Sequence, residues 1–125
     1  MTPTIVFGED GKPMLATGSP GGSTIITVVL QTILNVLAFD MGVAEASSVP
    51  RIHHQWLPDQ VFFESGISKD TLQILGTMGH RVGKKPRILG STQSIQRGQD
   101  NSTLGVSDPR RQGAGAVAQD TVNQQ

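Results

Sequence analysis

The chain has 125 residues, no cysteine, and ten basic against ten acidic side chains, so its formal net charge is zero. The missing cysteine excludes disulfide frameworks, cysteine nucleophiles and thiolate zinc sites. The neutral balance gives no electrostatic basis for binding nucleic acid or an anionic membrane surface. The longest apolar segment, residues 25–39, is interrupted by polar side chains and is short for a membrane span of about 20 residues. We therefore expect one domain with a modest core, containing a buried helix.

A hairpin and a long helix are predicted in the first third of the chain. Residues 4–7 and 14–17 are strand-like runs, and the Asp-Gly pair between them is typical of a hairpin. A glycine-rich loop, residues 18–23, follows, and its last residue, Ser23, is the expected N-cap of a helix over residues 24–39. The β-branched composition is poor for a helix, so we expect burial on most of its circumference.

Shorter elements are predicted in the rest of the chain, and they make the fold α+β by pattern, with helices on a largely antiparallel sheet. Gly42 is expected to end the long helix, and Ser68 to cap a later one. The expected elements are a helix at 43–48, an irregular segment at 51–58, a strand at 61–64, a helix at 69–78, a short strand at 81–82, and a hairpin of residues 93–96 and 103–106.

The loop at residues 18–23, with the sequence Gly-Ser-Pro-Gly-Gly-Ser, is the most informative stretch for function. Adjacent glycines let backbone N–H groups turn toward a ligand without a Cβ in the way. A following helix adds free N–H groups and a positive dipole end, which suits a bound or developing anion. The same local pattern also fits a plain turn followed by a helix cap. It matches neither a phosphate-binding P-loop nor a nucleophile elbow.

Several blocks, in order along the chain, resemble the gamma-glutamyltransferase (glutathione hydrolase) family. They are Pro3-Thr4-Ile5-Val6, residues 17–23, Ile25-Ile26-Thr27, Val29-Leu30-Gln31, Val43-Ala44-Glu45-Ala46, Pro50-Arg51, His53-His54-Gln55-Trp56-Leu57-Pro58, Gly90-Ser91-Thr92-Gln93-Ser94-Ile95 and Ser107-Asp108-Pro109-Arg110. The resemblance covers residues 1–111, which would form the C-terminal portion of the small subunit. We expect the remaining residues, 112–125, to be a disordered tail.

The resemblance implies part of an N-terminal-nucleophile hydrolase, an αββα sandwich, incomplete here at its N-terminal side. In such enzymes a threonine at the start of the small subunit attacks the gamma-glutamyl amide of glutathione, and the acyl group passes to water or an amino acceptor. Paired glycines donate backbone N–H groups to the oxyanion, a role that carries over to Gly21 and Gly22. Ser19, Pro20 and Ser23 would line the substrate. The resemblance implies no metal or cofactor.

This sequence lacks the family's nucleophile motif, which limits the activity that we expect of it. The family's Thr-Thr-His nucleophile motif and the residues that hold the glutamyl group lie upstream of the matched region. We therefore expect the chain alone to be inactive, with the large subunit and the N-terminal part of the small subunit as partners. Family analogy implies a periplasmic or secreted location. The alternatives are a non-catalytic binding or complementation module that docks with a separately encoded partner, and a truncated reading frame.

Other chemistry-bearing residues are given simpler interpretations. Thr2 matches no nucleophile position and is not expected to act as one. The histidines, including adjacent His53 and His54, lack metal-ligand spacing and are expected to form structural hydrogen bonds; a Ser–His pair with Ser19 or Ser23 is disfavoured. Two interpretations remain for Asp108 and Arg110: they form a local ion pair, or they contact the rest of an enzyme. Further expectations are core or interface packing for Trp56 and Leu57, and a solvated basic loop for Arg81, Lys84, Lys85 and Arg87.

Overall fold

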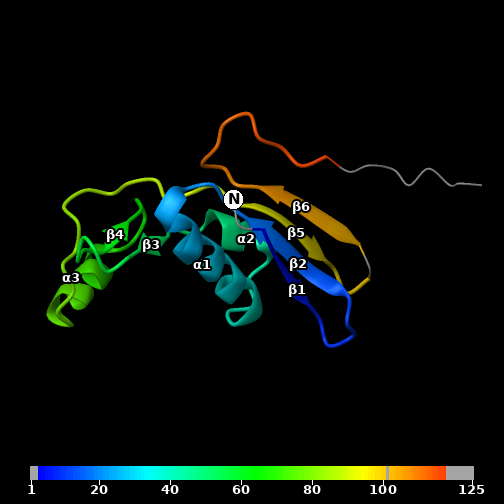
Figure 1. Cartoon of the computed structure of the whole chain (residues 1–125), viewed down its shortest axis with the longest axis horizontal. Helices are drawn as coiled ribbons and strands as arrows, with labels where there is room; N and C mark the ends of the chain where they lie inside the picture. Colours follow the sequence, from blue (N-terminus) through cyan, green and yellow to red (C-terminus); the bar gives the residue numbers. More distant parts are fainter. Residues whose placement is uncertain (1–2, 101, 118–125) are drawn as a thin grey trace, which may run out of the picture.

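A computed structural model describes residues 3–100 and 102–117 of the chain (Figure 1). In chain order, the elements are β1 (Thr4–Phe7), β2 (Pro13–Gly18), the 3-10 turn η1 (Gly22–Thr24), α1 (Ile25–Leu37), α2 (Val43–Ser48), β3 (Ile52–His53), β4 (Phe62–Phe63), α3 (Lys69–Thr77), β5 (Gln93–Arg97) and β6 (Thr103–Ser107). The predicted α+β class is confirmed, and so are both hairpins.

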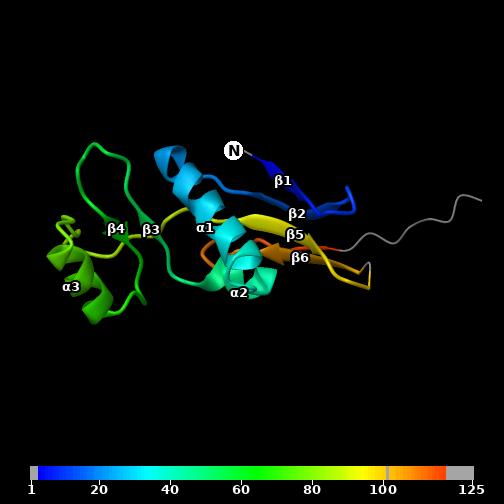
Figure 2. The ribbon, with the colours of Figure 1, turned by 90° about the horizontal axis from the view of Figure 1, so that it is seen from below.

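The main sheet has four antiparallel strands in the order β1-β2-β5-β6. Its two hairpins come from the two ends of the described chain and meet where β2 pairs with β5, with Gly18 opposite Gln93. One face of this sheet carries α1 and α2, as Figures 1 and 2 show. The core between them contains Leu15, Val36, Val43 and Ala46.

The opposite face of the main sheet is open and apolar. The side chains of Ile5, Phe7 and Ile95 are each more than half exposed there, and they alternate with more buried residues along their strands. Residues 115–117, which fall within the predicted tail of residues 112–125, help to line a groove on this face. Residues 118–125 lie outside the described part of the chain, so the disordered tail stays a prediction.

A separate lobe contains β3, β4 and α3. It lies beyond the N-terminal end of α1, away from the main sheet (Figures 1 and 2). Ser68 caps α3 as predicted, because its hydroxyl accepts a hydrogen bond from the backbone N–H of Thr71 at 3.1 Å. The expected strand at 81–82 is only a single parallel bridge between Val61 and Val82. Trp56 and Leu57 are 78% and 69% exposed on this lobe, which excludes the core alternative, and interface packing stays a prediction.

The predicted long helix required three corrections. Ser23 is not its N-cap, because η1 precedes the helix, and Thr24 occupies the N-cap position without a side-chain cap. Gly42 does not end the helix, which stops at Leu37; it is instead the extended N-cap of α2. Burial covers one face rather than most of the circumference, since Ile26 is 76% exposed while Val28 is fully buried. Within the described residues, no helix is long and apolar enough to cross a membrane.

Candidate functional site

The glycine loop leaves β2 and turns sharply into α1. Gly21 has φ of 143° and Gly22 has φ of 58°, so both adopt the left-handed backbone that favours glycine. A Cβ at Gly21 would lie 2.5 Å from Thr24 Oγ1, whereas a Cβ at Gly22 would meet no atom within 4 Å. The sequence therefore needs glycine at both positions for conformation, and at Gly21 also for space.

The carbonyl of Gly21 is held by the helix start, and the amides around it are free. Thr24 donates to Gly21 O twice, from its backbone N–H at 3.1 Å and from Oγ1 at 2.9 Å. Among the residues that the structure describes, neither the Gly21 nor the Gly22 N–H donates to a protein acceptor. Both glycines are exposed. Two unused N–H donors thus lie at the positive end of the α1 dipole, an arrangement that suits an anion.

Ser19 supports the loop on its buried side. It is fully buried, and its hydroxyl donates to Pro20 O at 2.7 Å while accepting from the backbone N–H of Ser91 at 2.9 Å. Gly90 has φ of 64° and packs so closely that a Cβ there would lie 2.6 Å from Ser19 Oγ. Ser19 therefore contacts a segment more than seventy residues away rather than a histidine. Ser23 and Pro20 lie at the more open side of the loop.

A buried ionic network lies next to this segment. Arg51 donates to Asp108 Oδ2 at 2.7 Å and to Leu89 O at 3.1 Å. Arg110 donates to Asp108 Oδ1 at 3.1 Å and to Glu64 Oε1 at 2.8 Å. The ion pair between Asp108 and Arg110, one of two alternatives for these residues, is thus present, but as part of a larger cluster. We call Arg51, Glu64, Asp108 and Arg110 the ionic network.

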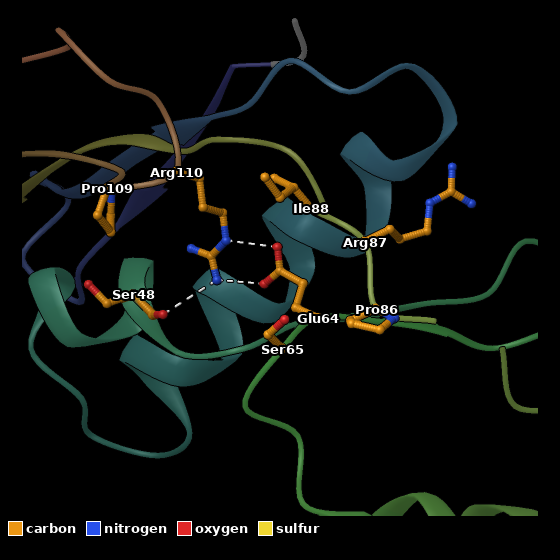
Figure 3. A pocket seen from close by; sticks show the side chains of 8 residues that line it. All are labelled: Ser48, Glu64, Ser65, Pro86, Arg87, Ile88, Pro109 and Arg110. Atoms are coloured by element: carbon orange, nitrogen blue, oxygen red, sulfur yellow. Dashed lines mark hydrogen bonds and ion pairs between the residues drawn. The ribbon is translucent and has the colours of Figure 1, made fainter. Parts of the chain in front are cut away.

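The ionic network borders a cavity of about 370 Å³, shown in Figure 3. In that view Arg110 reaches between Glu64 and Ser48, with Pro109 and Ile88 on either side. Arg87 also lines the cavity and lies 4.4 Å from the ring centroid of Phe62. The exposed Lys84 and Lys85 fit the predicted solvated loop, whereas Arg87 is held against an aromatic ring.

Electrostatics in the network favour the charged forms of Asp108 and Arg110. Burial alone raises the pKa of Asp108, but backbone donors from Arg110 and Thr92, together with the Arg51 guanidinium, hold this pKa below its usual value. Burial alone lowers the pKa of Arg110, yet its bonds to Glu64 and Asp108 raise this pKa overall. For Arg51 burial is the larger effect and lowers the pKa of the guanidinium. The positive charges of Arg51 and Arg110 are thus balanced by the carboxylates of Asp108 and Glu64, and all four side chains are largely shielded from water.

The histidines form structural hydrogen bonds, as predicted for His53 and His54. His53 is buried, with Nδ1 2.7 Å from Thr27 Oγ1 and Nε2 2.8 Å from Gln55 Oε1. The exposed His54 lies 3.3 Å from Asp59. Across residues 3–100 and 102–117, no three His, Asp or Glu side chains are grouped as metal ligands would be. Thr2 lies outside the described residues.

Sequence reasoning found the glycine loop but not the roles of Arg51 and Glu64. In the sequence, Arg51 stands only within a Pro-Arg pair and Glu64 only at the end of a predicted strand. A charged residue beside a proline or within an apolar strand run is the only local signal. Their partners lie 57 and 46 positions away along the chain, a separation that no local pattern reveals.

Known proteins match this chain over nearly its whole length. A model of the family described as Gamma-glutamyltranspeptidase matches residues 1–118. The glutathione hydrolase proenzyme of Escherichia coli strain K12 is 54% identical over 110 residues, which cover 88% of this chain and 19% of that protein. The Bacillus subtilis strain 168 proenzyme is 45% identical over 115 residues, covering 91% of this chain and 19% of that protein.

Solved structures agree with these matches. A mutant of Helicobacter pylori gamma-glutamyltranspeptidase superimposes with a TM-score of 0.81 at 43% identity, covering 89% of this chain and 61% of that one. The fold is therefore a part of the N-terminal-nucleophile hydrolase architecture, as the sequence resemblance implied. The chain spans about a fifth of the length of these curated relatives. Family model, identity and fold together establish that this chain belongs to the gamma-glutamyltranspeptidase family.

Proposed function

We propose that this chain supplies the oxyanion-stabilising loop of a gamma-glutamyltransferase or glutathione hydrolase. The complete enzyme would cleave the gamma-glutamyl amide of glutathione and transfer the gamma-glutamyl group to water or an amino acceptor. In this proposal the backbone N–H groups of Gly21 and Gly22 donate to the tetrahedral oxyanion. Pro20 and Ser23 form the loop wall beside the substrate, and the buried Ser19 supports the loop instead of lining the substrate. The attacking threonine comes from outside this chain.

The observation that supports this role best is the pair of unused, exposed amides at Gly21 and Gly22. Their donors need no rearrangement when negative charge develops, because the left-handed glycines and the Thr24 bonds to Gly21 O already fix the turn. Preorganised donors of this kind are worth about 3–4 kcal/mol each in acyl-transfer enzymes. The start of α1 adds favourable dipole electrostatics.

The remainder of the enzyme is the proposed partner. The chain spans only 19% of the Escherichia coli relative, and the sheet face that carries no helix exposes Ile5, Phe7 and Ile95. Such a face is larger than scattered surface apolar residues and is typical of an interaction surface. We infer that the large subunit and the N-terminal part of the small subunit cover it, completing the sandwich. The alternative, a non-catalytic complementation module, would use the same face to bind a separately encoded partner.

Complementation tests the proposal. The chain is mixed with a protein that begins with the family's threonine and lacks this region, and turnover of a chromogenic gamma-glutamyl anilide is measured. We expect no turnover from either component alone and turnover from the mixture. Robust turnover by the chain alone would refute the inactive-fragment part of the proposal. A stable complex without turnover, together with glutathione binding by calorimetry, would favour the complementation module instead.

A further inference from the structure

Residues 89–92 form a strut directly behind the glycine loop. The backbone N–H of Ser91 donates to Ser19 Oγ at 2.9 Å, and Gly90 Cα lies 3.5 Å from where a Cβ of Gly21 would be. Gly90 is also closely packed against Val28, at the first turn of α1. Any shift of this strut would therefore move Ser19 and Gly21 together.

The ionic network holds the strut at both ends. At one end, Leu89 N–H donates to Glu64 Oε1 at 2.7 Å, and Leu89 O accepts from Arg51. At the other end, the Thr92 N–H donates to Asp108 Oδ2 at 2.9 Å. Glu64 and Asp108 thus each accept a hydrogen bond from a backbone amide of the strut. Each of them also accepts one from an arginine. The strut carries no regular helix or strand hydrogen bonds of its own over residues 89–92.

Stability alone is a weak explanation for a buried cluster of this kind. Buried ion pairs contribute little net stability compared with apolar packing, because desolvation offsets their attraction. What they provide is fixed geometry, since each charge accepts few alternative arrangements once it is out of water. Arg51 is 1% exposed and Asp108 is 1% exposed, so both meet this condition.

We infer that Asp108 and Glu64 are positioning residues for the Gly21 and Gly22 amides, acting through the strut and the Ser19 hydroxyl. This inference rests on the proposed function for the direction in which the amides must point. The coupling itself, from network to strut to loop, is a property of this chain and can be measured without turnover. Ser19 is the link, because its hydroxyl joins the strut to Pro20 O.

The first experiment records amide NMR spectra of the full chain labelled with ¹⁵N. Ser19→Ala, Glu64→Gln and Asp108→Asn are each expected to shift the Gly21 and Gly22 amide signals. Two matched controls are expected to leave them in place. Asp10→Asn removes a carboxylate that binds Arg97 at the β1–β2 hairpin, and Thr77→Ala removes a hydroxyl that donates to a nearby carbonyl in α3.

The second experiment measures kinetics in the complemented enzyme. Because the amides act on the transition state, we expect Ser19→Ala and Asp108→Asn to lower kcat by roughly 10- to 100-fold while KM changes by less than about twofold. Ser19→Cys, which keeps a weaker hydrogen-bonding group of similar size, should fall between Ser19→Ala and the parent. Asp10→Asn and Thr77→Ala should retain the parent kcat.

The outcomes separate this inference from the proposed function. If the parent mixture has no turnover, the proposed function fails, and the NMR experiment alone decides whether the network positions the loop. Unchanged Gly21 and Gly22 signals in Ser19→Ala overturn the inference, as does an unchanged kcat in a mixture that turns over. Should Asp108→Asn unfold the chain, Ser19→Ala still decides, since it removes no charge.

Discussion

Gly21 and Gly22 share a left-handed backbone but differ in their surroundings. Alanine at Gly21 would meet Thr24 Oγ1 at 2.5 Å, whereas alanine at Gly22 would point into open space. We expect Gly21→Ala to lower the free energy of unfolding by about 1–3 kcal/mol, from strain and contact together. Gly22→Ala should cost only ~1 kcal/mol, the left-handed penalty. Urea unfolding of both variants checks the order, and equal losses would contradict it.

Asp108 gives the chain a predicted dependence of stability on pH. Its pKa in the folded chain lies below the unfolded value, so its contribution is fully present above the unfolded pKa of about 3.9 and is lost as pH falls through the folded pKa. Asp108→Asn leaves Arg51 and Arg110 short of a buried counter-charge and should cost about 3–5 kcal/mol at neutral pH. Denaturant unfolding from pH 7 to pH 2 should show this difference shrinking below about pH 4. A difference that stays constant with pH would contradict the assignment.

At the scale of elements, the buried and exposed faces of α1 should contribute differently to the free energy of unfolding. Val28 is fully buried against the sheet and the strut, while Leu30 is 51% exposed. Val28→Ala should lower the free energy of unfolding by about 1–3 kcal/mol, from lost transfer energy and a residual cavity. Leu30→Ala, two residues along the same helix, should change it by less than about 0.5 kcal/mol. Equal effects in urea unfolding would mean that the outer face is also covered in the isolated chain.

The start and burial of α1 show what a local pattern can and cannot predict. The serine after the glycines was a reasonable cap, but a 3-10 turn forms first because left-handed Gly22 tightens the entry. One side of α1 faces β3, where Gln31 bonds the backbone of Ile52 in both directions. Another side of the helix exposes apolar residues within the described part of the chain, namely Ile26, Leu30, Leu34 and Leu37, so burial on most of the circumference was the wrong expectation.

At the scale of the whole molecule, the open sheet face predicts the behaviour of the isolated chain. Ile5, Phe7 and Ile95 leave an apolar surface exposed on this face, which should bind a hydrophobic dye and promote self-association. Ile95→Thr should reduce both, by removing the central apolar side chain from strand β5. Ile88→Thr changes an isoleucine that is 74% exposed, against 53% for Ile95, and that lies away from this face, so it serves as the control. Dye fluorescence and light scattering measure the effect, and equal reductions in both variants would contradict it.

How much could be predicted from the sequence depends on how local each feature is. Both hairpins, the short helix α2 and the Ser68 cap follow from neighbouring residues, and they were predicted. The glycine loop was located, and its family role proposed, because its residues are contiguous. The ionic network joins residues from three separate segments of the chain, so its charges give no signal until the fold brings them together. The oxyanion role of Gly21 and Gly22 stays a prediction.

The strand order also constrains the route by which the chain folds. Each hairpin can form from neighbouring residues alone, but the β2–β5 pairing must first close a loop containing α1, α2 and the whole lobe. Such long-range pairing is slow because the entropy of loop closure is lost before the contacts form. Ser19 and the strut lie immediately beside this last seam, between Gly18 and Gln93. The proposed oxyanion loop would thus acquire its shape in the final step of folding, when the two halves of the sheet join.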